Sequence, residues 1–420
     1  MNMEKEVRRL MRDPDLLPPE KQTLLLRIAD HAVSMNMPCY LVGGLVRDIF
    51  LGKPVNDLDI IVEGDAIQFG ESLVKKYGGK LIAHQKFRTA IWHLPSNFAQ
   101  NIQPSSLDLI TTRNETYLNP GALPTIKPST IEDDLRRRDF TINAMAVRVD
   151  GGHFGELLDP LNGRTDLEKG IIRTLHPRSF IDDPTRIFRA IRYEARYGFK
   201  IEPESLGLIN SESLAVITRL SGERIRHELD LIFEEESSSQ MILRAGSLDV
   251  FKRIHPELPV FNPAYLDFLN IDPILDIPAS RTAIGYMLWL IDLSEAEILS
   301  IAERLDFNSD LTYSVWAASQ LKKSLPFLAN SKPSVWTFAL EKLPPLSIYM
   351  VYHVSRENAL LDYLSTWRYI RPRTTGEDLI SHGLPPGPRF GEILSQLRAA
   401  WLDGEVKNAQ EEKEFLNILL

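Results

Sequence analysis

The stretch "GGLVRDIFLGKPVNDLDIIV", from Gly43 to Val62, decides the fold of this chain. It follows the short apolar run "CYLV", which is typical of a buried strand. Two glycines come next, then a short helical pattern that stops at Gly52, then a second strand, "DLDIIV". Strands disfavour both Asp and Gly. Their crowding here therefore indicates a function beyond packing.

The two aspartates of "DLD" are one residue apart. Side chains on a strand alternate between faces, so Asp57 and Asp59 are expected on one face, about 6 to 7 Å apart. Two such carboxylates repel unless a cation lies between them, and hard oxygen ligands suit Mg²⁺. That ion neutralises a triphosphate and aligns phosphoryl transfer. Taken alone, D-x-D is better explained by a pair of strand-end or turn aspartates, since so short a pattern is unspecific.

The glycines change this balance. Gly43 and Gly44 lie between a strand and a helix, where backbone N–H groups can meet phosphate oxygens. Arg47, on the first helical turn, adds a cation. A glycine pair alone indicates no more than a tight turn. Turn, short helix and D-x-D together predict that the glycines hold a triphosphate and that the aspartates hold its metal.

This arrangement resembles the first motif of the nucleotidyltransferase superfamily that contains DNA polymerase β. It is most similar to the class II tRNA nucleotidyltransferases, the bacterial and eukaryotic CCA-adding type, and to the related bacterial poly(A) polymerases. Their motif reads Gly-Gly-x-Val-Arg-Asp, a short apolar helix, then Asp-x-Asp. The resemblance extends over five motif stretches to about Phe233.

A second motif lies in "DLRRRDFTINAMAV". Its arginines are typical either of a solvated face or of a clamp for phosphate or ribose. The family's Arg-Arg-Asp matches Arg137, Arg138 and Asp139. The resemblance implies that Arg138 contacts the nucleotide and that Asp139 contacts its sugar.

The helical stretch "IDDPTRIFRAIRYEARYGFKIE" carries an arginine stripe opposite an apolar face. Asp183 and Pro184 are expected at its N-cap and first helical position. A like-charged stripe weakens an isolated helix, so an anionic partner is expected, with a solvated face as the alternative. The family's fourth motif matches Asp183, Arg186, Arg189 and Arg192, which the resemblance assigns to nucleotide binding.

The pair Asp183 and Arg186 suggests how a base is chosen. Cytosine and adenine each present an amine donor beside a ring-nitrogen acceptor, whereas guanine and uracil present the reverse. Asp183 only accepts hydrogen bonds and Arg186 only donates them. Side by side, they are expected to complement C and A and to oppose G and U.

A third carboxylate would help to deprotonate the attacking 3′-hydroxyl. Asp108, on the predicted strand "SLDLIT", is the candidate. An exposed strand aspartate without a catalytic role is the alternative.

The length, composition and charge of the whole chain limit what these motifs can belong to. It has 420 residues, 44% of them hydrophobic, and a formal net charge of -9, so more than one domain and only local basic faces are expected. One cysteine, Cys39, excludes an internal disulfide. The charged N-terminus has no apolar signal core, and no run reaches a membrane span. A soluble cytoplasmic protein is expected.

The expected fold class is α+β. It comprises an N-terminal nucleotidyltransferase head with a small mixed β-sheet, then an all-helical neck, body and tail. The expected bounds are 1–148 for the catalytic head, 149–246 for a neck that recognises the base, 247–330 for the body and 331–420 for a tRNA-binding tail. Residues 113–129, rich in proline, are expected as a loop.

The leading functional interpretation is template-independent, Mg²⁺-dependent addition of CCA from CTP and ATP to the 3′ end of tRNA. The rivals are an A-adding or CC-adding enzyme, a poly(A) polymerase, and a non-catalytic RNA-binding protein of the same fold. The intact aspartates argue against the last, since a pure binder gains nothing from two repelling carboxylates. The sequence leaves open whether the protein is a monomer or a homodimer.

Overall fold

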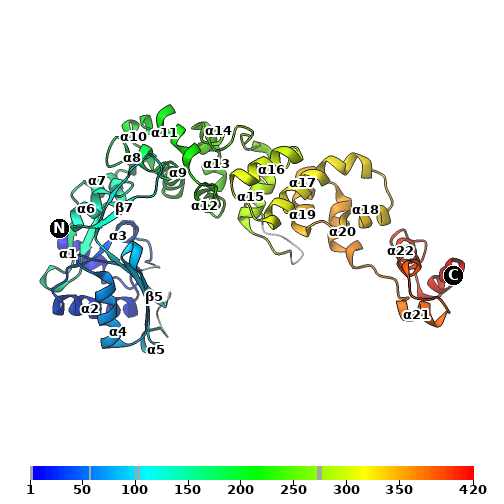
Figure 1. Ribbon diagram of the computed structural model, residues 1–420, viewed down its shortest axis with the longest axis horizontal. Helices are drawn as coiled ribbons and strands as arrows, with labels where there is room; N and C mark the ends of the chain where they lie inside the picture. The colour runs from blue at the N-terminus through cyan, green and yellow to red at the C-terminus, as the bar shows by residue number, and fades with distance from the viewer. Residues whose placement is uncertain (1–2, 56–57, 100–101, 103–104, 272–276) are drawn as a thin grey trace. The chain divides into compact units, whose positions relative to one another are not determined.

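The computed structural model describes residues 3–55, 58–99, 102, 105–271 and 277–420. It divides into two compact units, Met1–Leu220 and Ser221–Leu420 (Figure 1). Asn56 and Asp57 lie outside the described residues. Among the described helices, none combines the length and the apolarity needed to cross a membrane.

The first unit is built on one seven-stranded mixed sheet. The only parallel pair within this sheet is β2 with β5, and its other neighbours are antiparallel. In spatial order its strands are β3 (Lys80–His84), β4 (Thr89–His93), β5 (Ser106–Thr111), β2 (Asp59–Val62), β1 (Cys39–Val42), β8 (Ala146–Arg148) and β9 (Glu156–Leu158). The expected mixed sheet of an α+β head is thus confirmed.

Helices and two small ribbons complete this unit. Its helices are α1 (Met3–Leu10), α2 (Pro19–Ser34), α3 (Gly44–Phe50), α4 (Ala66–Tyr77), α5 (Ser96–Ala99), α6 (Ile131–Arg136), α7 (Gly163–Glu168), α8 (Ser179–Asp182), α9 (Thr185–Tyr197), α10 (Pro203–Gly207) and α11 (Ser211–Val216). The ribbons are β6 (Arg113–Thr116) with β7 (Thr125–Pro128), and β10 (Ile171–Ile172) with β11 (Lys200–Ile201).

Alternation along the strands gives the sheet two different faces. On one face Ile61 packs with Ile131 and Leu135 of α6. Ile60 and Val62 alternate with Ile61 and are fully buried on the other face, which α4 covers beside α2 (Figure 1). Asp59, two residues before Ile61, belongs to the face that carries α6.

The expected loop at residues 113–129 is in fact a hairpin. β6 and β7 pair antiparallel, from Arg113 with Pro128 to Thr116 with Thr125. The prediction failed because both strands are short and polar, and because the prolines near the tip hide their alternation.

The second unit is helical. It contains α12 (Gly222–Phe233), α13 (Ser238–Ser247), α14 (Val250–Ile254), α15 (Arg281–Leu290), α16 (Glu295–Arg304), α17 (Ser309–Leu328), α18 (Pro333–Leu340), α19 (Pro345–Ser355), α20 (Asn358–Ser365), α21 (Gly376–Ser381), α22 (Pro388–Leu402) and α23 (Ala409–Leu419). Side-chain caps start many of them, for example Ser294 at α16 and Asn308 at α17.

Candidate active site

Two of the three candidate carboxylates lie side by side. In the parallel pairing of β2 with β5, Asp59 is the direct partner of Asp108. Paired residues of neighbouring strands share a face, with the strands about 4.8 Å apart. Asp108 is exposed and Asp59 is half-buried, so the pair borders solvent. The third candidate, Asp57, lies outside the described residues.

The glycine turn sits against an arginine. Gly43 has φ +63° between β1 and α3, and a Cβ there would come within 2.4 Å of Arg138 Nη1. The positive φ favours glycine here, and the close approach places Arg138 directly against the turn. The next residue, Gly44, begins α3, and a Cβ on it would lie 3.3 Å from Arg47 Nη2. The structure therefore brings the predicted triphosphate-binding residues together.

Arg47 is buried and held from several sides. Its Nη1 donates to Asn143 Oδ1 at 2.6 Å and its Nε donates to Asp48 Oδ1 at 3.0 Å. The guanidinium also lies over the rings of Tyr193 and Tyr197, 5.2 and 4.8 Å from their centroids. Burial disfavours the charged form, but Asp48 outweighs it and the net effect raises the pKa of Arg47.

The Arg138 guanidinium is held in its orientation by a carboxylate that was not predicted from the sequence. Asp134, in α6, is fully buried and lies 2.9 Å from Arg138 Nη2 and 2.7 Å from Arg137 Nη2. Burial alone would raise the pKa of Asp134, but the two guanidinium groups more than offset it and lower that pKa. The available signal was an aspartate four residues before an arginine in a helical pattern.

Asp139 is also buried, and both of its oxygens are engaged. Oδ1 accepts from Asn143 Nδ2 at 2.9 Å and from the Phe140 N–H at 2.8 Å. Oδ2 accepts from Arg189 Nε at 2.7 Å. Burial raises the pKa of Asp139, and Arg189 outweighs this to lower it. The proposed ribose contact of Asp139 would therefore start from a carboxylate that the protein already orients.

The arginine face of α9 is exposed at Arg196, partly exposed at Arg189 and buried at its other two arginines. Arg186 and Arg192 are 5% and 7% exposed. Arg186 Nη1 donates to Ser179 Oγ and its Nη2 donates to the Arg137 carbonyl, both at 2.8 Å. A guanidinium has five N–H groups. Two bonds to described residues thus fix its position and leave other N–H groups for a ligand.

Asp183 lies at the start of α9, and its side chain accepts hydrogen bonds there, as expected of an N-cap residue. The helix begins at Thr185 after Pro184, which makes no side-chain cap. Asp183 Oδ1 instead accepts from the Thr185 N–H at 3.2 Å and from Thr185 Oγ1 at 2.8 Å, in a local turn. The carboxylate lies three residues before Arg186, as the expected reading pair requires.

The β6–β7 hairpin reaches the same region. Glu115 Oε1 accepts from Arg137 Nη1 at 2.8 Å, and the Tyr117 hydroxyl donates to Glu115 Oε2 at 3.2 Å. At the tip, the Gly121 N–H donates to the Asp182 carbonyl at 3.2 Å. Burial, and then Glu115, raise the pKa of Tyr117 to about 12, while Arg186 opposes them. The hairpin thus packs beside Asp183 and Arg186.

Sequence reasoning found the motif residues but missed the groups that hold them. The missed residues are Glu115, Asp134, Asn143 and Ser179. None belongs to a spacing pattern that by itself indicates chemistry. Apart from Asp134, each was recognisable only once its charged partner had a position.

Comparison with known proteins shows the family to which this chain is similar. Residues 39–173 match the family model described as Poly A polymerase head domain, and residues 198–261 match "Probable RNA and SrmB- binding site of polymerase A". An A-adding tRNA nucleotidyltransferase of Halalkalibacterium halodurans is 33% identical over 405 residues, which are 93% of this chain and 91% of that protein.

Solved structures give the same result. A CCA-adding enzyme in apo form II superimposes with a TM-score of 0.84 at 30% identity, over 99% of both chains. The Thermotoga maritima CCA-adding enzyme complexed with tRNA superimposes with a TM-score of 0.77 at 28% identity, over 98% of both chains. This chain belongs to the family of class II tRNA nucleotidyltransferases and bacterial poly(A) polymerases.

Proposed function

We propose that this protein adds CCA to the 3′ end of tRNA, taking C from CTP and A from ATP without a nucleic-acid template. The observation that carries the proposal is the pairing of Asp59 with Asp108 on the sheet face that also carries α6. The Gly43 turn and Arg138 lie against each other in the same unit.

In the proposed reaction the tRNA 3′-oxygen attacks the α-phosphorus of the nucleotide. A new phosphodiester bond forms, the bond to the β-phosphate oxygen breaks, and pyrophosphate leaves. Asp108 accepts the proton of the 3′-hydroxyl. The N–H groups of Gly43 and Gly44, with Arg47 and Arg138, bind the triphosphate charge.

Nucleotidyltransferases of this family generally use divalent metal ions, and the residues here fit one. Asp59 and Asp108 supply hard carboxylate oxygens from adjacent strands, at a border with solvent. We assign Mg²⁺ to Asp59, together with Asp57 from the same motif. When bound, this ion supplies charge neutralisation for the triphosphate.

Base choice falls to Asp183 and Arg186. Arg186 is fixed by Ser179 and by the Arg137 carbonyl, so its remaining N–H groups point in a set direction. A base that presents an acceptor where C and A present a donor, and a donor where they present an acceptor, would leave buried polar groups unpaired. That costs about 1–3 kcal/mol per group.

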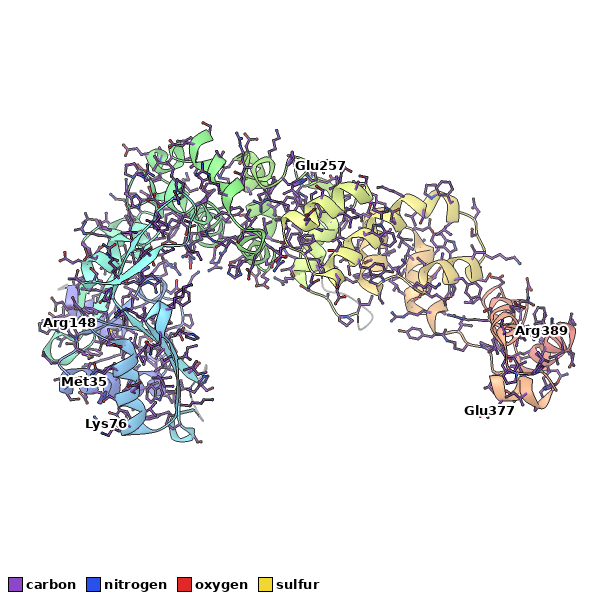
Figure 2. The ribbon with its side chains drawn as sticks, viewed as in Figure 1. Met35, Lys76, Arg148, Glu257, Glu377 and Arg389 are labelled. Carbon is purple, nitrogen blue, oxygen red and sulfur yellow. The ribbon has the colours of Figure 1, made fainter. Side chains whose placement is uncertain are left out.

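The tRNA partner is assigned to both units. Residues 171–200 carry seven Lys or Arg and three Asp or Glu, a balance of 7 - 3 = +4. In the proposed tail, α21 and α22 flank a Gly-Pro turn, and both Glu377 and Arg389 are exposed there (Figure 2). The unpaired, buried Cys39 fits the reducing cytoplasm.

A-addition alone is the second candidate. It is favoured by the A-adding relative, which matches 93% of this chain. Such an enzyme would extend only tRNA that already ends in CC, and it would use only ATP.

One experiment separates these functions. Transcribed tRNA lacking its last three, two or one nucleotides is incubated with CTP, with ATP, or with both, and product lengths are read at single-nucleotide resolution. CCA addition predicts two C with CTP alone and a full end with both nucleotides. Extension of only the CC-ended tRNA, by ATP, would establish A-addition. Long A tracts on unrelated RNA would overturn both.

A further inference from the structure

Asn143 stands out because it is buried, polar and outside every residue proposed to touch the nucleotide. It ends the short 3-10 helix η2 (Thr141–Asn143) and is 4% exposed. Its own N–H donates to the Phe140 carbonyl at 3.0 Å, which anchors its backbone. A buried amide side chain is tolerated only when its oxygen and nitrogen are both satisfied.

The other polar groups of Asn143 each contact a different residue that is proposed to bind the nucleotide. Its Oδ1 accepts from Arg47 Nη1 at 2.6 Å, and its Nδ2 donates to Asp139 Oδ1 at 2.9 Å. Its main-chain oxygen lies 3.5 Å from Arg138 Nη1. One residue thus contacts a cation of α3 and the Arg138–Asp139 pair that follows α6.

Only a primary amide fits between these two partners. Arg47 needs an acceptor and the Asp139 carboxylate needs a donor, and Asn supplies both from one short side chain. A carboxylate in its place would still accept from Arg47 but would face Asp139 with like charge. An alanine would leave both buried ions short of one partner.

The contacts of Asn143 also close a ring that includes α9. Asp139 Oδ2 accepts from Arg189, and Arg189 Nη2 donates to the Tyr193 hydroxyl at 2.9 Å. The Tyr193 ring in turn packs under Arg47, whose Cζ is 5.2 Å from the ring centroid. The ring therefore runs from Arg47 through Asn143, Asp139, Arg189 and Tyr193 back to Arg47.

We propose that Asn143 is a positioning residue. It fixes the position of Arg47, which binds the triphosphate, relative to α9, the helix that recognises the base. The inference rests on the proposed function, since it takes the nucleotide roles of Arg47 and α9 from there. Asn143 itself touches no substrate. It acts by holding one guanidinium and one carboxylate at a fixed separation, so that phosphate and base are bound in a single geometry.

The test compares Asn143→Ala and Asn143→Asp with Thr141→Val. Thr141 is the matched control, because it lies in the same 3-10 helix and its buried hydroxyl donates to Asp166 Oδ2 at 2.7 Å. Losing that bond perturbs the fold locally without touching Arg47 or Asp139. Melting temperature, KM and kcat for CTP and ATP, and calorimetric nucleotide binding without RNA are measured for each variant.

The proposal predicts that both Asn143 variants raise KM and the nucleotide Kd about 10- to 100-fold, for CTP and ATP alike, while kcat changes less. Thr141→Val should lower the melting temperature and leave KM unchanged. If Asn143→Ala bound nucleotide like the wild type, or if Thr141→Val raised KM equally, the positioning role would be refuted. Failure of the wild type to extend tRNA would instead refute the proposed function. The calorimetric Kd values would still show whether Asn143 positions the nucleotide-binding residues.

Discussion

The two units differ in how many ionic side chains they bury and in the partners of those side chains. In Met1–Leu220 several ionic side chains are buried, and the buried aspartates pair with partly exposed arginines, whereas the described part of Ser221–Leu420 buries mainly hydroxyl groups. The buried ionic residues of the first unit are Lys21, Arg47, Asp134, Asp139, Asp150, Asp166, Arg186 and Arg192. Those of the second unit are Glu228 and Glu412.

The partners of these groups differ as well. Asp134 is held by two guanidinium groups, at 2.7 and 2.9 Å. Glu412, the buried acid that joins the tail helices, accepts from the N–H groups of Arg373 and Thr374 and from Trp401 Nε1. Burying an ion is unfavourable unless it is paired and hydrogen-bonded. Asp134 is thus paired with cations, whereas Glu412 is held by neutral donors, and we expect nucleotide binding in the first unit only.

The largest effect is expected at the carboxylates. Asp59→Ala and Asp108→Ala should each lower the rate of single-turnover nucleotide addition by about a thousandfold or more. The first variant loses a ligand of the metal ion, and the second loses the general base. The melting temperature should stay within a few degrees, because both side chains border solvent. Turnover within tenfold of wild type for either variant would remove that residue from the mechanism.

A matched pair of isosteric changes sharpens the comparison between the units. Asp134→Asn removes the charge that aims Arg138, and Glu412→Gln turns an NH₂ group toward backbone donors. Each should destabilise its own unit by about 1–3 kcal/mol. Only Asp134→Asn should also raise KM for CTP and ATP, by about tenfold.

Chemical denaturation and steady-state kinetics on both proteins check this. An equal rise in nucleotide KM for Glu412→Gln would show that the second unit shares in nucleotide binding. An unchanged KM for Asp134→Asn would remove the aiming role of Asp134.

The smallest expected effect is that the free energy of unfolding decreases at low pH. The pKa values of Asp134 and Asp139 are lowered in the folded protein by Arg138 and Arg189, against the effect of burial. A lowered folded-state pKa adds stability that is complete above the unfolded value, about 3.9 for Asp, and is lost as the pH falls through the folded value. Unfolding free energy should therefore fall below about pH 4, and less steeply for Asp134→Asn. Equal slopes for both proteins would contradict the assignment.

The sequence was sufficient to predict strands β1 to β5 and to mark the residues that belong to a motif. Gly43, Asp59 and Arg186 carry their signal in local spacing, because turn, strand and helix each impose a short period. Asp108 needed only the further assumption that its strand joins the same sheet, and it proved to pair directly with Asp59.

Most of the remaining features depend on tertiary contacts that no local period records. Asn143 gains its role only beside Arg47, which lies 96 residues before it, whereas the pair of Asp134 with Arg138 is a local i, i+4 contact that the sequence pattern could have shown. α9 starts at Thr185, one residue after the expected Pro184, and the Asp183 side chain still accepts from the Thr185 N–H. The hairpin was missed because short polar strands resemble a loop until they pair.

The central claim is that the buried charge cluster of the first unit selects the nucleotide, and Arg186 tests it most directly. Incorporation of all four nucleotides into tRNA by Arg186→Ala is measured beside its melting temperature and its CTP affinity. The account predicts that preference for CTP and ATP over UTP and GTP falls by about 10²-fold or more, while triphosphate binding persists. Unchanged selectivity with only a lower melting temperature would show that Arg186 merely ties α9 to Ser179 and Arg137, and would contradict the account.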